Sequence, residues 1–231
     1  MTDVDHDGPP PGPLAALGTL AASEAAITDD LDHIEMYTRS GLLTLLWHGP
    51  GDRRQVVLMV GGAMGGMLGP GRALYHQMGV ELASAGVGAI RVGYRVPNDI
   101  DMCVLDTMAA AEMAARQGAR GFVVMGHSFG GAVAIQTGAA LGDMAAGVIT
   151  AATQAGDCEP GEGLACPVLH LHGDADELLP PMASQMVQML TGGELVVYPG
   201  AGHMLSEAHD EMAALLGTWI PEALAAHPSA G

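Results

Sequence analysis

The sequence lacks lysine altogether. Its 8 basic residues are all arginine and face 26 acidic residues, which gives a formal net charge of −18. A chain this acidic repels phosphate backbones and anionic membranes, so neither nucleic acid nor a membrane is an expected partner. Aromatic residues make up only 3% of the chain, too few for stacking platforms that bind single-stranded nucleic acid. The simplest interpretation of the acidity is solubility, and adaptation to high salt is the alternative.

Cysteine and long apolar runs are also scarce. Cys103, Cys158 and Cys166 form neither a CxxC pair nor a zinc-binding spacing. Cys158 and Cys166 are close enough to pair across a short loop, but a reduced setting is the preferred interpretation. No stretch approaches the roughly 18 apolar residues that span a bilayer, and the N-terminus lacks the basic and apolar segments of a signal peptide. We therefore expect a soluble, cytoplasmic protein, while its oligomeric state stays open.

The chain is long enough for one domain with a substantial core. It has 231 residues, of which 49% are hydrophobic, and its 34 glycines and 14 prolines show no collagen-like period. Prolines crowd the first 13 residues, so residues 1–31 are expected to form a flexible N-terminal arm. Within it, the Ala/Leu-rich stretch 14–28 is compatible with a short helix. Residues 32–231 are expected to form a single domain.

From residue 32 onward the hydrophobic pattern indicates alternating strands and helices. A hairpin over residues 32–48 precedes QVVLMV (55–60), whose unbroken apolarity is typical of a strand buried on both faces. Further strands are expected at 87–95, 121–126, 146–153, 167–173 and 194–199. Helices are expected at 72–86, 100–117, 129–141, 182–190 and 206–224. This alternation predicts an α/β fold with a mostly parallel sheet and helices on both faces, whose chemistry lies at the carboxyl ends of the strands.

One such strand end carries the strongest local motif. Gly126-His127-Ser128-Phe129-Gly130 follows the strand FVVM and precedes a helix, which is the context of a G-x-S-x-G nucleophile elbow. Side chains two residues before or after the serine would clash where strand and helix approach each other, hence the glycines. The turn forces Ser128 into strained backbone angles and leaves its hydroxyl exposed above the sheet. Ser128 is therefore the predicted nucleophile.

A serine nucleophile needs a base, and the base needs a carboxylate that orients it. Of the ten histidines, His203 follows the strand ELVVYP in a glycine-flanked loop and is the preferred base. The loop HGDADELLP offers Asp174 and Asp176 as acids. We prefer Asp176, which lies far enough past the strand to reach the histidine loop, over Asp174 and the minor rival Glu177. The order Ser128, Asp176, His203 is that of α/β-hydrolases rather than of chymotrypsin or subtilisin.

These motifs resemble those of small, capless α/β-hydrolases, such as carboxylesterases and dienelactone-hydrolase-like proteins, over roughly residues 32–224. The resemblance rests on VVLMVGGAMGG, GHSFGG, HGDADELLP and GAGHM in this order. It implies an eight-stranded, mostly parallel sheet and chemistry through an acyl-enzyme. Dienelactone hydrolases proper use a cysteine nucleophile, whereas this elbow holds Ser128, so the resemblance transfers the fold and the triad but not that substrate. Between Ser128 and Asp176, the expected helix and strands leave only residues 154–166 unassigned, which is too short a segment for a large cap.

Within the resemblance, two backbone N–H groups should hold the oxyanion. One belongs to Phe129, which follows the nucleophile. The other is assigned to Ala63 in GGAMGG, with Met64 as the alternative one residue further on. A phosphate-binding reading of this glycine-rich loop is disfavoured because the Lys-Ser/Thr of a P-loop is missing.

The expected function is hydrolysis of carboxylic esters with small or medium acyl groups, without metal or organic cofactor. A thioesterase or an acyltransferase with the same triad is the alternative, so the expected partner is a small ester or thioester. A non-catalytic binding protein with a hydrolase fold is a further alternative. Such proteins typically lose a triad member, and all three are present here.

Overall fold

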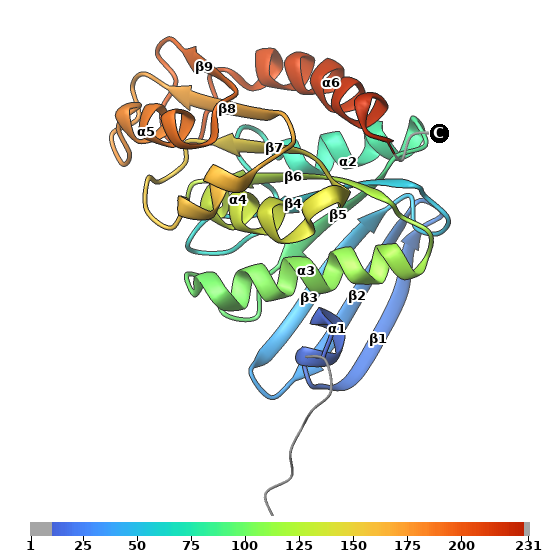
Figure 1. Cartoon of the computed structure of the whole chain (residues 1–231). Coiled ribbons are helices and arrows are strands. Elements are labelled where there is room, and N and C mark those ends of the chain that lie inside the picture. Colours follow the sequence, from blue (N-terminus) through green and yellow to red (C-terminus); the bar gives the residue numbers. More distant parts are fainter. Residues whose placement is uncertain (1–10, 229–231) are drawn as a thin grey trace, which may run out of the picture.

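The computed structural model describes residues 11–228 as one continuous sheet with helices packed on it (Figure 1). The strands are β1 (Thr19–Thr28), β2 (Leu31–Thr38), β3 (Gly41–His48), β4 (Gln55–Val60), β5 (Gly88–Gly93), β6 (Gly121–His127), β7 (Ala145–Ala151), β8 (Val168–Gly173) and β9 (Glu194–Tyr198). The α-helices are α1 (Pro13–Ala16), α2 (Leu74–Ser84), α3 (Ile100–Arg116), α4 (Phe129–Leu141), α5 (Met182–Thr191) and α6 (His209–Ala226), and the 3₁₀ turns are η1 (Gly142–Met144) and η2 (Glu159–Gly163).

The sheet is mostly parallel and has the strand order β1-β2-β3-β5-β4-β6-β7-β8-β9. β1, β2 and β3 form an antiparallel meander, β3 pairs antiparallel with β5, and the remaining strands are parallel. The central strands β6 and β7 are buried along their whole length, which explains their unbroken apolar sequences. The α/β class is therefore confirmed, with nine strands in the described chain instead of the eight expected.

The ninth strand is β1. Its presence shows that the prediction of a flexible arm with a short helix was wrong for the segment directly before residue 32. Residues 13–28 are not a flexible arm, and no helix runs over 14–28: a four-residue helix is followed by a ten-residue strand. β1 pairs with β2 from Thr19↔Thr38 to Thr28↔Leu31. This alanine-rich segment has no strand pattern of its own, and its conformation depends on pairing with β2. The rest of the predicted arm, residues 1–10, lies outside the described residues.

Two apolar cores lie on opposite faces of the sheet. One forms between the sheet and α3, α4 and α5, and the other between the sheet and α2 and α6. β4 and β6 are buried strands in the middle of the sheet, and their successive side chains point alternately into one core and the other. Helices thus cover both faces, as expected, and the loops at the carboxyl ends of the central strands form the edge of the sheet at which a site is expected.

Those loops are short. Between β7 and β8, in the segment 154–166 that the sequence analysis assigned to no strand or helix, the structure has the single turn η2 rather than a cap domain. Within residues 11–228, no cap domain covers the carboxyl ends of β4, β6, β8 and β9.

Candidate active site

Ser128 occupies the sharp turn between β6 and α4. Its backbone angles, φ 58° and ψ −123°, lie in a region that residues other than glycine rarely adopt. A Cβ at Gly126 would overlap the Gly130 carbonyl, and a Cβ at Gly130 would overlap the Gly61 carbonyl. The predicted clash between strand and helix is confirmed for Gly126, whereas Gly130 is confined by the backbone at the end of β4. Because α4 begins at Phe129, the N–H of Phe129 belongs to the first helical turn and has no acceptor within the helix.

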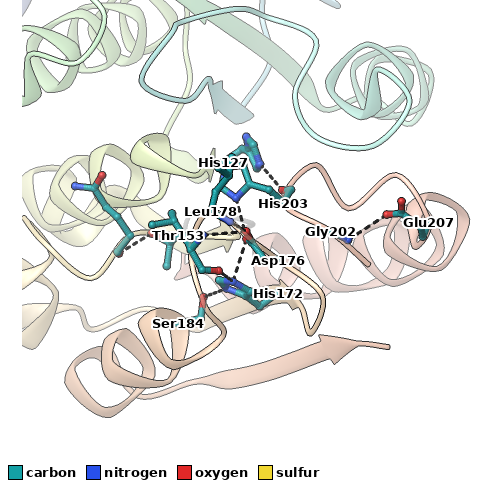
Figure 2. A network of polar contacts seen from close by, with 11 residues as sticks. His127, Thr153, His172, Asp176, Leu178, Ser184, Gly202, His203 and Glu207 are labelled. Atoms are coloured by element: carbon teal, nitrogen blue, oxygen red, sulfur yellow. Dashed lines mark hydrogen bonds and ion pairs between the residues drawn. The ribbon is translucent and has the colours of Figure 1, made fainter. Parts of the chain in front are cut away.

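His203 and Asp176 meet across 27 positions of the sequence. The Nδ1 atom of His203, in the loop after β9, lies 2.8 Å from Oδ2 of Asp176, in the loop after β8 (Figure 2). Since the carboxylate only accepts, Nδ1 carries the proton and donates it, which leaves Nε2 as the basic nitrogen of a neutral ring. The rival Asp174 has a different partner: its Oδ1 accepts a hydrogen bond from the N–H of Gly200 at 2.6 Å. It therefore fixes the start of the histidine loop.

The carboxylate of Asp176 is fully buried and richly hydrogen-bonded. Its Oδ1 accepts from the N–H groups of Leu178 (2.8 Å) and Leu179 (2.9 Å). Burial by itself would raise the pKa of Asp176, but the hydrogen bonds from Leu179, His203 and Leu178 outweigh it and lower the pKa. Asp176 therefore stays ionised and can stabilise a positive charge on His203.

Ser128 and His203 line the same cavity, which has a volume of about 450 Å³. Across the described chain, no hydrogen bond joins the Ser128 hydroxyl to the His203 ring. In hydrolases such contacts often tighten only when substrate binds. The lining residues are Gly61, Gly62, Ala63, Met64, Gly65, Gly66, Met67, Leu68, Gly69, His127, Ser128, Leu178, His203 and Met204.

The glycine-rich loop after β4 lies directly against the nucleophile. A Cβ at Gly62 would come within 3.4 Å of the Ser128 Cβ, and Ala63, next in sequence, lines the cavity. Two tyrosine hydroxyls hold the start of this loop: Tyr75 donates to the Val60 carbonyl at 2.9 Å, and Tyr94 donates to the Gly61 carbonyl at 3.2 Å. The loop thus leaves β4 in a fixed direction.

His127 is a site residue that the sequence reasoning set aside. Its Nε2 lies 2.9 Å from the His203 carbonyl oxygen, and the two rings are 4.9 Å apart. A carbonyl only accepts, so Nε2 of His127 donates and tethers the histidine loop to the elbow. Burial lowers the pKa of His127 to about 4, so the ring is neutral at pH 7. In the sequence, only the position of His127 directly before Ser128 indicated that it belongs to the site.

His170 and the three cysteines do not line this cavity. His170 is fully buried on β8, and its Nδ1 lies 2.8 Å from the Thr150 hydroxyl oxygen on the neighbouring strand β7. Cys103, Cys158 and Cys166 are free thiols. Among residues 11–228, no cluster of histidine, cysteine and carboxylate side chains suits a metal ion, and no helix is long and apolar enough to cross a membrane.

Comparisons with known proteins agree with this fold. The sequence model of the dienelactone hydrolase family matches residues 90–224. Est1E from Butyrivibrio proteoclasticus superposes with a TM-score of 0.70 at 16% identity, over 84% of this chain and 99% of that one. A serine hydrolase without lid from Xanthomonas campestris has a TM-score of 0.70 at 20% identity, over 88% of this chain and 100% of that one.

A dienelactone hydrolase from Anabaena variabilis is similar as well, with a TM-score of 0.66 and 16% identity, over 87% of this chain and 98% of that one. No curated protein sequence matches the chain. At these identities the solved structures establish the α/β-hydrolase fold without a cap. The family match, which spans more than half of the sequence, establishes that the chain belongs to the dienelactone hydrolase family of hydrolases.

Proposed function

We propose that the protein is a serine hydrolase that cleaves carboxylic esters through Ser128, His203 and Asp176. The observation that carries the proposal is the 2.8 Å contact between His203 Nδ1 and Asp176 Oδ2, beside a cavity that both His203 and Ser128 line. In the neutral ring this contact keeps the proton on Nδ1, so Nε2 is the nitrogen free to act as the general base.

The chemistry proceeds in two halves. His203 Nε2 takes the proton of the Ser128 hydroxyl while Oγ attacks the ester carbonyl, and the N–H groups of Phe129 and Ala63 stabilise the oxyanion. Nε2–H then protonates the leaving alcohol as the C–O bond breaks, which leaves an acyl-enzyme. Water, deprotonated by Nε2, releases the acid and regenerates Ser128. Asp176 stabilises the imidazolium in both halves.

The cavity favours an uncharged, apolar acyl group. Among its lining residues in the described chain none carries a carboxylate or a guanidinium, and Met64, Met67 and Met204 offer flexible apolar surface. Arg91 contacts this loop but does not line the cavity: it is buried, and its Nη1 donates to the Met67 carbonyl oxygen at 3.3 Å. A charged acyl group would lose its hydration here without gaining a partner.

The first test compares wild type with Ser128→Ala on p-nitrophenyl acetate and butyrate. We expect turnover by wild type and a loss of at least about 10³-fold in the variant. A fluorophosphonate should label wild type at Ser128 and leave Ser128→Ala unlabelled. Equal rates in the two proteins would remove Ser128 from the mechanism, and an unlabelled wild type would favour a non-catalytic binding protein.

The second test addresses the substrate. p-Nitrophenyl butyrate and mono-p-nitrophenyl succinate have acyl chains of equal length, but only the succinate carries a charge. We expect kcat/KM to be lower for the succinate by about tenfold or more. A preference for the succinate would contradict the proposed substrate class. Acyl-CoA esters in the same panel decide between an ester hydrolase and the thioesterase alternative, which would use the same triad.

A further inference from the structure

A second histidine contacts the acid of the proposed triad. His172, on β8, is fully buried and does not line the cavity. Its Nε2 lies 2.9 Å from the Leu179 carbonyl oxygen and 3.3 Å from Asp176 Oδ2, the same oxygen that accepts from His203 (Figure 2). Asp176 Oδ2 thus lies between two imidazole nitrogens.

The hydrogen-bond partners determine the tautomer of His172. The Leu179 carbonyl and the Asp176 carboxylate only accept, so Nε2 must carry a proton. On the other side, Nδ1 lies 2.6 Å from the hydroxyl oxygen of Ser184. In the neutral tautomer with the proton on Nε2, Nδ1 accepts a hydrogen bond from this hydroxyl. Ser184 therefore fixes the orientation of the ring, with Nε2–H directed at the acid loop.

His172 also hydrogen-bonds to the backbone segment that hydrogen-bonds to Asp176. Leu179 donates its N–H to Asp176 Oδ1 at 2.9 Å and accepts from His172 at its own carbonyl. The carboxylate is consequently held at Oδ1 by backbone and at Oδ2 by side chains, and it cannot rotate without losing a partner. A packing histidine would need none of these contacts.

We propose that His172, oriented by Ser184, is a positioning residue that holds the Asp176 carboxylate in line with the His203 ring. The proposal rests on the proposed ester hydrolysis. It assigns a task to a buried histidine and a buried serine that take no part in the chemistry itself, in the way that groups behind a ligand or a catalytic base fix its orientation.

A matched set of variants tests the position of the donor rather than its presence. The amide nitrogen of His172→Gln reaches the place of Nε2, whereas that of His172→Asn reaches only the place of Nδ1, and His172→Leu has no donor. We expect the Asn and Leu variants to lose about 10-fold to 100-fold in kcat. KM should be unchanged because His172 does not touch the cavity. The Gln variant should retain most of the activity.

The pH profile separates positioning from packing. The acidic limb of kcat/KM reports the protonation of free His203, whose titratable neighbours are Asp176, His127 and, within its own loop, Glu207. Without the His172 donor, the Asp176 carboxylate is free to turn away from the His203 ring, and the imidazolium form of His203 loses stabilisation. The acidic limb should move to lower pH in the Asn and Leu variants and return in the Gln variant.

Val187→Ala is the packing control, because Val187 is buried on α5 one turn from Ser184 and has no polar group that could hydrogen-bond to Asp176. Rates are expressed per fluorophosphonate-labelled serine, so misfolded molecules do not count. Wild-type kcat in His172→Asn, or a reduced kcat with an unmoved limb, would overturn the proposal. If the proposed hydrolysis itself were wrong, wild type would show neither turnover nor labelling, and the His172 proposal would fall with it.

Discussion

At the scale of single residues, two glycines allow the sharp turn that holds Ser128, the proposed nucleophile. Ser128 is held at a positive φ, and the strand before it crosses close to the helix after it. Gly126 and Gly130 leave room for the carbonyl groups of Gly130 and Gly61, respectively. The strain at Ser128 is therefore sustained by backbone contacts that no larger residue permits.

We predict that Gly130→Ala destabilises the fold by about 3 kcal/mol and abolishes fluorophosphonate labelling, because the new methyl group meets backbone that cannot move aside. Gly217→Ala is the matched control, since Gly217 lies inside α6 with open space where a Cβ would be. There the substitution should stabilise by up to about 1 kcal/mol. Urea denaturation measures both changes, and similar losses in the two variants would contradict the steric explanation.

At the scale of elements, α3 shows how a local signal sets a boundary. Asp99 has extended backbone angles, and its Oδ1 accepts a hydrogen bond from the N–H of Met102 at 3.1 Å. Asp99 therefore caps the helix, and α3 begins at Ile100, where the sequence analysis places its start. β1 is the contrasting element, because its conformation depends on the neighbour with which it pairs.

For the cap we expect Asp99→Ala to lower the free energy of unfolding by about 1 kcal/mol, since an N–H of the first turn loses its acceptor. Asp99→Asn keeps a capping oxygen and should lose much less. Urea denaturation at pH 7 compares the two. The cap would be unimportant for stability if the alanine variant unfolded at the wild-type urea concentration.

At the scale of the whole molecule, buried histidines make the fold sensitive to acid. Burial is the main reason why the pKa values of His48, His127 and His170 fall to about 4. In the unfolded chain a histidine has a pKa of about 6.5. Between these values the unfolded state binds protons that the folded state does not, so stability falls as the pH drops from about 6.5 to 4. Asp106 opposes this trend in part, because burial raises its pKa.

We predict a loss of stability that approaches about 4 kcal/mol per pH unit near pH 5, if all three histidines contribute. His170→Gln should reduce this slope by roughly a third, because one proton fewer is taken up on unfolding. Urea denaturation from pH 7.5 to 4.5 measures the slope. A stability independent of pH over this range, or an unchanged slope in the variant, would contradict the prediction.

The sequence by itself determined the parts of the molecule in which one local cause dominates. Unbroken apolar runs such as that of β4 indicate buried strands, and the glycines around Ser128 indicate a turn that excludes side chains. In each case the chemical reason is contained within a few neighbouring residues.

Only the tertiary structure decided the rest. The conformation of β1 depends on β2, because an alanine-rich segment has no strong preference of its own. The tether from His127 to the His203 carbonyl joins residues 76 positions apart, and the choice between Asp174 and Asp176 depends on which loop atom each carboxylate reaches. The approach of His172 to Asp176 depends on how the loop after β8 turns back. Hydrogen bonds act over about 3 Å, so they exist only after the chain has folded.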